Sequence, residues 1–311
     1  MEYLEIKNTT LKVSRLCMGG CPMGGYGWGN VQEDELITAV HAAIDNGITM
    51  FDTADTYGLG QSEITLGKAL SSRRKDVVIA DKFGVRVEKG KTFYDNSSEY
   101  IRKAINASLK RLKTDYIDLY QVHYRDGITP LPVVICTLEE LKQAGKIRYY
   151  GLSNIHKEDY PELKQFIGKI ASVQDEYSLA CRKNEAELQI LCSDFLMTPL
   201  TWGSLGQGIL TGKYNKTTVF DSNDRRSRDI YVNFHGDKLL KNLEIVEYLK
   251  PIAQKYNKPI SAIAIRFILD WLKESVVLVG AKRPSQILDN IKSCDWFLTI
   301  EELTLLDKIS K

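Results

Sequence analysis

The sequence of 311 residues predicts an α/β protein built as a (β/α)₈ TIM barrel, in a single domain over residues 1–311. Short runs rich in Val, Ile and Leu alternate with stretches of helical periodicity, as expected of buried parallel strands that are each followed by a helix. No Gly-x-Gly-x-x-Gly motif follows the first run, which disfavours the competing doubly wound sheet. The eight predicted strands are 15–19, 48–52, 77–82, 117–123, 149–153, 171–174, 198–202 and 276–280.

Several helices between these strands carry start and stop signals. The segment 33–46 places Leu36, Ile37, Val40, Ala43 and Ile44 on one face, and Gly47 ends it. Ser97 or Ser98 can cap a helix with Ile101, Ile105, Leu109 and Leu112 on its face. Thr299, followed three residues later by Glu302, predicts a capping box for the last helix.

Two polar segments interrupt the alternation. Residues 84–96 and 213–236 are predicted to be long loops, and loops of this length are usually functional lids or disordered. Both alternatives stay open for 213–236, which carries Lys213 and Arg226 as candidate cofactor contacts. Two helical patterns, 237–256 and 260–273, then precede the last strand, one more helix than an ideal barrel needs.

Composition and charge exclude several classes of protein. The 42 Lys and Arg against 40 Asp and Glu leave a formal charge of +2 without a long run of one sign, so no field for nucleic acid or an anionic membrane is expected. No apolar stretch approaches the ~18 residues that span a bilayer. The first residues lack the basic and apolar regions of a secretory signal. We therefore expect a cytoplasmic protein without nucleic-acid or membrane partners, whose oligomeric state the sequence leaves open.

The cysteines indicate neither a disulfide framework nor a metal site. Six cysteines are spread along the chain, and only Cys17 and Cys21 lie close together. No His or Cys cluster has the spacing of metal ligands. We predict buried free thiols and no metal.

Four residue types suited to proton transfer fall at the carboxyl ends of three consecutive predicted strands. They are Asp52, Tyr57, Lys82 and His123. In a barrel these ends form the active-site face. Taken singly, Asp52 could cap a turn, Lys82 could extend its ammonium to water and His123 could be a satisfied core group. Their arrival at one barrel mouth instead predicts a catalytic set.

The chemistry of this set points to carbonyl reduction. A tyrosine titrates near ~10, too high for an efficient acid at neutral pH, so we expect the ammonium of Lys82 to lower the pKa of Tyr57 and Asp52 to hold Lys82. His123 can orient a carbonyl oxygen. Because no side chain supplies hydride, a nicotinamide or flavin cofactor is implied.

With these motifs in place, the chain resembles the aldo-keto reductases over essentially its whole length. The overall pattern is most similar to a bacterial branch with inositol- and sugar-associated reductases and relatives of potassium-channel β subunits. The resemblance implies an Asp-Tyr-Lys-His tetrad at the four positions above and an NADPH site along the barrel mouth. It rests on the segments 51–58 (FDTADTYG), 60–63 (GQSE), 82–84 (KFG), 109–119 (LKRLKTDYIDL), 151–154 (GLSN), 174–178 (QDEYS), 205–213 (LGQGILTGK) and 280–283 (GAKR).

The resemblance also implies the residues along the cofactor. Trp202 stands where the family usually has a Tyr under the nicotinamide ring, and the carboxamide, pyrophosphate and adenosine ends follow. The positions that match the carboxamide contacts are Ser153, Asn154 and Gln174. Those along the pyrophosphate are Leu205, Gly206 and Gly208, and those at the adenosine end are Gly280, Lys282, Gln286 and Asn290. Lys282 and Arg283 precede a helix start, where basic side chains and free N–H groups suit a 2′-phosphate and favour NADPH over NADH.

The substrate is the least defined part of the prediction. Trp28, Tyr124 and Arg125 are candidate contacts for a small carbonyl or alcohol, although Trp28 could equally anchor its loop. Aromatic and polar loops suit a sugar- or polyol-like aldehyde or ketone. Two alternatives stay open: an NADPH-binding regulatory subunit with little turnover, and a lyase or isomerase that works through an enolate without hydride.

Overall fold

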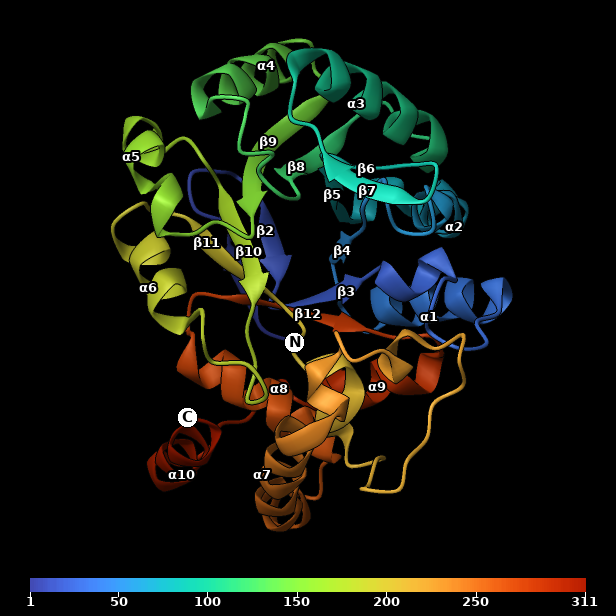
Figure 1. Cartoon of the computed structure of the whole chain (residues 1–311), viewed down its shortest axis with the longest axis vertical. Helices are drawn as coiled ribbons and strands as arrows, with labels where there is room; N and C mark the ends of the chain where they lie inside the picture. Colours follow the sequence, from blue (N-terminus) through green and yellow to red (C-terminus); the bar gives the residue numbers. More distant parts are fainter.

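The computed structural model describes residues 1–311 and contains a closed barrel of eight parallel strands. Figure 1 shows the helices arranged around these strands. All eight predicted strands are present, so the (β/α)₈ barrel is confirmed. In their order around the barrel they are β3 (Leu16–Gly19), β4 (Met50–Asp52), β5 (Val78–Phe83), β8 (Ile117–Val122), β9 (Ile147–Ser153), β10 (Ser172–Glu176), β11 (Thr198–Trp202) and β12 (Val276–Gly280).

A small antiparallel hairpin covers the amino-terminal end of the barrel. It consists of β1 (Tyr3–Glu5) and β2 (Lys12–Ser14), with Leu4 opposite Val13. Ile6, Leu11 and Val13 are buried against the inward-facing apolar side chains of the strands. This end of the barrel is therefore filled by apolar side chains, and the opposite end is left for polar ones.

The helices match the periodicities of the sequence. Ser97 Oγ accepts a hydrogen bond from the Tyr100 amide, and Thr299 and Glu302 form both bonds of the predicted capping box. The two helical patterns before the last strand are confirmed as α7 and α8. The helices are α1 (Glu33–Asp45), α2 (Gln61–Leu70), α3 (Ser98–Leu112), α4 (Leu131–Gln143), α5 (Tyr160–Leu163), α6 (Glu185–Ser193), α7 (Gly236–Tyr256), α8 (Ile260–Trp271), α9 (Pro284–Ile291) and α10 (Ile300–Ser310).

Residues 84–96, which the sequence predicted to be a loop, form a β-hairpin instead. Its strands are β6 (Val85–Glu88) and β7 (Lys91–Tyr94). Lys89 and Gly90 form the two-residue connection, and both have positive φ angles of 49° and 75°. Two such residues suit the tight turn that matches the twist of a hairpin. The polar composition hid this hairpin because both of its faces are largely exposed.

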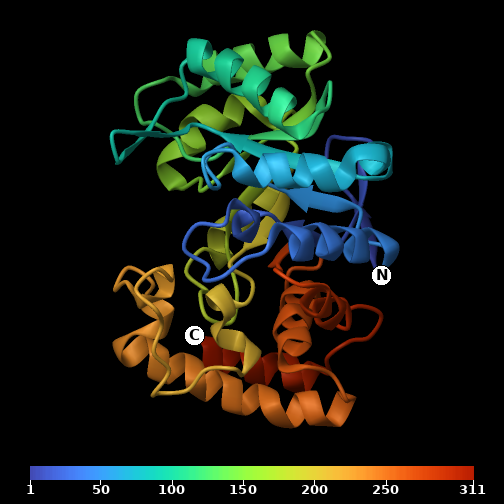
Figure 2. The ribbon, with the colours of Figure 1, turned by 90° about the vertical axis from the view of Figure 1, so that its right-hand side faces the viewer.

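The insert 213–236 is folded across the barrel mouth and packs against the loop that follows β3. The Arg225 amide donates to the Gly27 carbonyl at 3.0 Å, and its guanidinium donates to the Tyr26 carbonyl at 2.7 Å. Arg226 is surrounded by Tyr214, Phe220 and Phe234. Figure 2 shows the insert, the loop after β3 and the β6–β7 hairpin on one side of the molecule, with the N-terminus on the other. The backbone of the insert 213–236 is irregular except for two short 3₁₀ turns, 225–227 and 232–234.

Two further sequence expectations meet the structure here. No helix is long and apolar enough to cross a membrane. All six cysteines are free, as predicted, but only Cys17 and Cys294 are buried and Cys136 is exposed on α4. The expectation of buried thiols throughout is therefore wrong, because Cys136 lies on the solvent face of its helix.

Candidate active site

The four predicted catalytic residues meet at the carboxyl end of the barrel. Asp52 ends β4, Lys82 lies near the end of β5, His123 follows β8 and Tyr57 lies in the loop after β4. Side chains of a strand alternate between its two faces, so Lys82 points into the barrel on the same side as Val78 and Ala80. Neighbouring strands end together, which brings all four side chains to one place.

Asp52 and Lys82 form a buried ion pair at the base of this site. The Lys82 ammonium donates to both Asp52 carboxylate oxygens, at 2.7 and 2.6 Å, and to the Thr53 carbonyl at 3.0 Å. Neither side chain is more than 3% exposed. Three acceptors satisfy the three ammonium protons, so Lys82 is fixed in position.

Tyr57 and His123 lie above this pair. The Lys82 ammonium is 5.1 Å from the centroid of the Tyr57 ring. The rings of Tyr57 and His123 meet edge to face, with centroids 5.7 Å apart and an angle of 84° between their planes. The Tyr57 ring therefore lies next to both the Lys82 ammonium and the His123 ring.

The environment raises the pKa of Tyr57 well above its ordinary value, contrary to the sequence prediction of a lowered pKa. Burial is the main cause, and the negative charge of Asp52 acts in the same direction. The Lys82 ammonium is paired with Asp52, whose negative charge raises the pKa of the phenol. Tyr57 is thus a neutral phenol with a proton to give.

His123 is held neutral. Burial lowers the pKa of its imidazole well below the ordinary value, and the Lys82 charge lowers the pKa further. Its Nδ1 atom is buried without a hydrogen-bond partner. A neutral imidazole can donate from one nitrogen, as a carbonyl-orienting group must.

Four of the predicted nicotinamide-binding residues form one hydrogen-bonded network. Ser153 Oγ donates to the Gln174 carbonyl at 2.8 Å, and Asn154 Nδ2 donates to the His123 carbonyl at 3.0 Å. The Trp202 indole N–H donates to Asn154 Oδ1 at 3.3 Å. Gln174 Nε2 donates to Asp52 Oδ2 at 2.9 Å, which joins this network to the ion pair.

The glycine-rich segment after β11 has a backbone conformation that favours glycine at two positions. Gly206 and Gly208 have φ angles of 54° and 107°. A Cβ atom at Gly206 would lie 2.8 Å from Ile209 Cγ2 and 2.9 Å from Ala180 Cβ. Leu205 precedes this turn and packs partly buried against the core. The backbone here is shaped by glycine, as a segment that runs close to a ligand would be.

The predicted adenosine end lies at β12 and α9. Gly280 is exposed, and the Lys282 amide donates to Gln286 Oε1 at 2.8 Å. Asn290 is buried on α9, and its Nδ2 atom has no partner. A buried amide with unused donors fits a cofactor base at this place.

The two basic residues of this end have different surroundings. The Lys282 ammonium donates to the Trp28 carbonyl at 2.7 Å, so it ties the loop after β3 to β12. Arg283 is exposed and pairs with Glu35 on α1 at 3.3 Å. Arg283 is thus free to exchange a surface carboxylate for a ligand phosphate.

The predicted substrate contacts separate into two groups. The Tyr124 ring stacks on His123 with centroids 5.1 Å apart, whereas the Trp28 indole N–H donates to Cys21 Sγ at 3.4 Å and its ring lies beside Arg225. Arg125 is taken up by Asp159 at 3.2 Å, Glu162 at 3.4 Å and the Thr129 carbonyl at 3.1 Å. We therefore correct the assignment of Arg125, whose guanidinium ties the loop after β8 to the region of α5 rather than facing the substrate space.

The structure adds an aromatic residue that the sequence prediction missed. Tyr94 on β7 stacks on Tyr124 with centroids 5.1 Å apart, which extends the aromatic wall outward from His123. The sequence prediction missed Tyr94 because it treated residues 84–96 as a loop. A predicted hairpin would have indicated it, since the returning strand β7 brings residue 94 back to the barrel.

A buried acidic cluster behind the tetrad was also missed. Asp55, Glu63 and Asp81 lie between β5 and helices α2 and α3, with Arg111 bound to Glu63 at 2.6 Å. Burial, with the nearby Glu63, raises the pKa of Asp55 to about 7, and burial also raises the pKa of Asp81 well above its ordinary value. Arg111 pairs with Glu63 alone, so neither Asp55 nor Asp81 has an ion-pair partner in this cluster.

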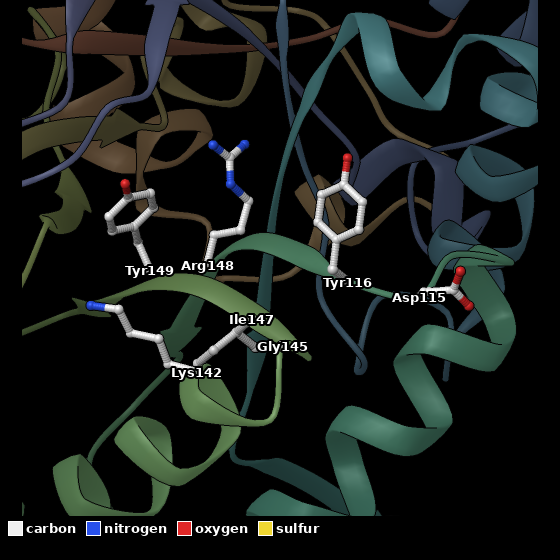
Figure 3. Close-up of a pocket in the computed structure, with 7 residues that line it drawn as sticks. All are labelled: Asp115, Tyr116, Lys142, Gly145, Ile147, Arg148 and Tyr149. Carbon is white, nitrogen blue, oxygen red and sulfur yellow. The ribbon is translucent and has the colours of Figure 1, made fainter.

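A surface depression of about 590 Å³ lies at the opposite end of the barrel (Figure 3). Its lining includes Lys142, Arg148, Tyr116 and Tyr149, from the beginnings of β8 and β9 and the end of α4. Arg148 is already paired with Asp118 at 2.8 Å. The depression is lined by none of the four tetrad residues, so the carboxyl end of the barrel is the candidate active site.

Comparison with known proteins identifies the family of the chain. The Aldo/keto reductase family model matches residues 15–311. The chain belongs to the aldo-keto reductase family. The predicted enzyme class, an NAD(P)H-dependent aldo-keto reductase, is thereby confirmed.

Individual relatives align over nearly the full chain. Aldo-keto reductase YhdN of Bacillus subtilis is 35% identical over 97% of this chain and 91% of its own length. An NADH-specific methylglyoxal reductase of Escherichia coli is 31% identical over 100% and 99%.

Solved structures of aldo-keto reductases share the fold. A glycerol dehydrogenase of Gluconobacter oxydans superimposes with a TM-score of 0.88 at 32% identity, covering 99% of this chain and 94% of its own. An aldo-keto reductase of Klebsiella pneumoniae in complex with NADPH has a TM-score of 0.76 at 25% identity, with coverages of 100% and 96%.

Proposed function

We propose that this aldo-keto reductase catalyses the NADPH-dependent, reversible reduction of an aldehyde or ketone to an alcohol, with Tyr57 as the proton donor. The observation that carries the proposal is the contact of the Tyr57 ring with both the Lys82 ammonium and the His123 ring at the barrel mouth. These groups suit protonation of a carbonyl oxygen that gains negative charge.

Each residue of the tetrad has a role in moving or holding this proton. When bound, NADPH supplies the hydride from its nicotinamide C4. The Tyr57 hydroxyl gives its proton to the carbonyl oxygen, and the neutral His123 donates a hydrogen bond that orients that oxygen. Lys82 is fixed by Asp52, so its charge stabilises the phenolate that Tyr57 becomes.

The raised pKa of Tyr57 sets which protonation form of the phenol is present at neutral pH. Reduction requires the phenol, whereas oxidation of an alcohol requires the phenolate as base. Because burial keeps the proton on Tyr57, the resting site is prepared for a carbonyl substrate at neutral pH.

NADPH is the cofactor that the residues fit best. Ser153, Asn154, Gln174 and Trp202 would hold the nicotinamide, and Asn290 offers unused donors for the adenosine end. Lys282 and Arg283 lie where a 2′-phosphate would bind. The NADH-specific relative shows that the choice of nucleotide varies among similar chains, so a comparison of both nucleotides belongs in the test.

A small polar carbonyl is the substrate class we propose. The substrate space is bordered by Trp28, Tyr94 and Tyr124, whose rings can pack on a carbon chain while polar groups face His123. Two relatives are named for glycerol and methylglyoxal. Both are short oxygenated molecules, which supports a sugar- or polyol-like aldehyde or ketone here.

The proposal is tested by titrating the protein with NADPH and NADH, then adding a panel of aldehydes, ketones and sugars. We expect protein fluorescence to change on nucleotide binding and nicotinamide absorbance to fall on addition of a substrate. Tyr57→Phe should bind NADPH as tightly as the wild type and lose at least about 10³-fold in kcat, in line with the loss of a general acid. Full turnover by Tyr57→Phe would overturn the assignment of the acid, and binding without turnover on any carbonyl would favour the regulatory alternative.

A further inference from the structure

Three residues far apart in the sequence come together just outside the barrel mouth. They are His156 in the loop after β9, Asp175 in β10 and Glu187 in the first turn of α6. One ligand atom from each lies within 4.8 Å of the others. Figure 1 shows α6 beside the carboxyl end of β10. His156 and Asp175 are 19 residues apart, and Asp175 and Glu187 are 12 apart. This spacing matches no metal-binding motif, which is why the sequence predicted no metal.

The separation of the first two ligand atoms is that of neighbours around one metal ion. His156 Nδ1 and Glu187 Oε2 are 3.1 Å apart. Metal–ligand bonds of about 2.1 Å place neighbouring ligands about 3.0–3.4 Å apart, whether the geometry is octahedral or tetrahedral. The two atoms are therefore close enough to bind one ion, which would replace the hydrogen bond between them.

Asp175 provides an independent indication of a ligand. The residue is buried, and its Oδ1 atom accepts from the Glu176 amide at 2.7 Å and from Asn184 Nδ2 at 2.8 Å. Its Oδ2 atom is buried and accepts nothing. A buried carboxylate oxygen without a donor is costly, and a cation is the partner that would remove this cost.

We propose that His156, Asp175 and Glu187 bind a divalent transition-metal ion of the Zn²⁺ type. Two carboxylates carry the charge that a divalent cation neutralises, and the imidazole selects Zn²⁺, Co²⁺ or Ni²⁺ over Mg²⁺ and Ca²⁺, which prefer oxygen ligands. Three protein ligands leave a further position for water.

The bound ion would connect three elements next to the nicotinamide-binding residues. Asp175 follows Gln174, and His156 lies two residues after Asn154. An ion held between them ties the ends of β9 and β10 to α6. This site is separate from the tetrad, and its occupancy is measured without reference to turnover.

The test is a calorimetric titration of the chelator-treated full-length protein with ZnCl₂. We expect about one ion per chain. The variants His156→Ala, Asp175→Asn and Glu187→Gln should each weaken binding at least about tenfold, as expected for the loss of one ligand. The matched controls are His41→Ala, which removes another exposed histidine, and Glu158→Gln, which removes a neighbouring exposed acid; both should bind Zn²⁺ as the wild type does.

A second measurement keeps the proposal testable if one variant folds poorly. Saturating Zn²⁺ should raise the Tm of the wild type by about 5 °C, because the assembled site binds the ion more tightly than the unfolded chain does, and should not raise the Tm of His156→Ala. Unchanged Zn²⁺ affinity in both His156→Ala and Glu187→Gln would place any ion elsewhere, for example on the free cysteines, and would overturn the proposal. So would the absence of saturation at millimolar ZnCl₂.

Discussion

Gln174 Nε2 donates a hydrogen bond of 2.9 Å to Asp52 Oδ2, although the two residues lie on opposite sides of the barrel ring, on β10 and β4. Asp52 in turn binds the Lys82 ammonium. A residue expected to hold the cofactor thus also holds the buried ion pair, so cofactor binding and the orientation of the tetrad share one side chain.

We predict that Gln174→Met, which keeps the length of the side chain and removes its donor, lowers kcat by about tenfold, the cost of one hydrogen bond to a charged group. Steady-state kinetics and a fluorescence titration with NADPH would separate the effect on kcat from the effect on nucleotide binding. An unchanged kcat with weakened NADPH binding would show that the bond to Asp52 has no part in turnover.

The raised pKa of Tyr57 predicts different pH profiles for the two directions. Reduction uses the protonated phenol and should be nearly independent of pH between about 6 and 9. Oxidation of the product alcohol uses the phenolate, so its kcat/KM should rise about tenfold per pH unit over the same range. Initial rates in both directions test this, and a reduction rate that falls between pH 7 and 8 would show that the pKa of Tyr57 is lowered after all.

Gly24, in the loop after β3, supports Tyr57 by close backbone contact. A Cβ atom at residue 24 would lie 2.6 Å from the Tyr57 carbonyl carbon and from the Gly58 nitrogen. Gly24→Ala should therefore displace Tyr57 and lower kcat by roughly 10²-fold, the usual effect of a shift of about 1 Å in a reacting group. Circular dichroism and Tm establish that the variant is folded. A folded Gly24→Ala protein with normal kcat would contradict the prediction.

Asp55 makes the stability of the protein depend on pH. Its pKa is raised from 3.8 to about 7 by burial and by Glu63. The folded state therefore binds the proton more tightly than the unfolded state, and this contribution to stability is present below about pH 4 and lost as pH rises to about 7. Asp55→Asn keeps the acceptor for the Tyr100 hydroxyl, which donates to Asp55 Oδ2 at 3.0 Å.

The free energy of unfolding of Asp55→Asn should accordingly exceed that of the wild type by roughly 1–3 kcal/mol at pH 8 and match it near pH 4. Urea unfolding at the two pH values measures the difference. Asp76→Asn, which changes an exposed carboxyl, serves as the control and should show no such dependence. Equal stability of Asp55→Asn and the wild type at pH 8 would mean that Asp55 is ionised without cost.

Lys282 and Arg283 are predicted to select the cofactor. Lys282→Ala and Arg283→Ala should each weaken NADPH by about tenfold and NADH by much less, because only NADPH carries the 2′-phosphate. Fluorescence titrations with both nucleotides give the ratio. Arg283→Ala is the cleaner variant, since Lys282 also binds the Trp28 carbonyl. Equal weakening of the two nucleotides would exclude a role in phosphate recognition.

The sequence by itself determined the barrel and the positions of the polar residues at its mouth. Apolar runs and helical periodicity are local patterns, so they locate β3 and its seven partners in the barrel without any knowledge of contacts. The parallel order then places Asp52, Lys82 and His123 on one rim, because all strands end at the same side.

Only the tertiary structure decided the partners and the charge states of these residues. The pKa of Tyr57 is raised rather than lowered because its burial and the pairing of Lys82 with Asp52 depend on packing. Arg125 is bound by Asp159 and Glu162, which the sequence places more than thirty residues away. His156, Asp175 and Glu187 likewise meet only in three dimensions. Desolvation and ion pairing act between residues that are close in space, and a local sequence pattern carries no record of these distances.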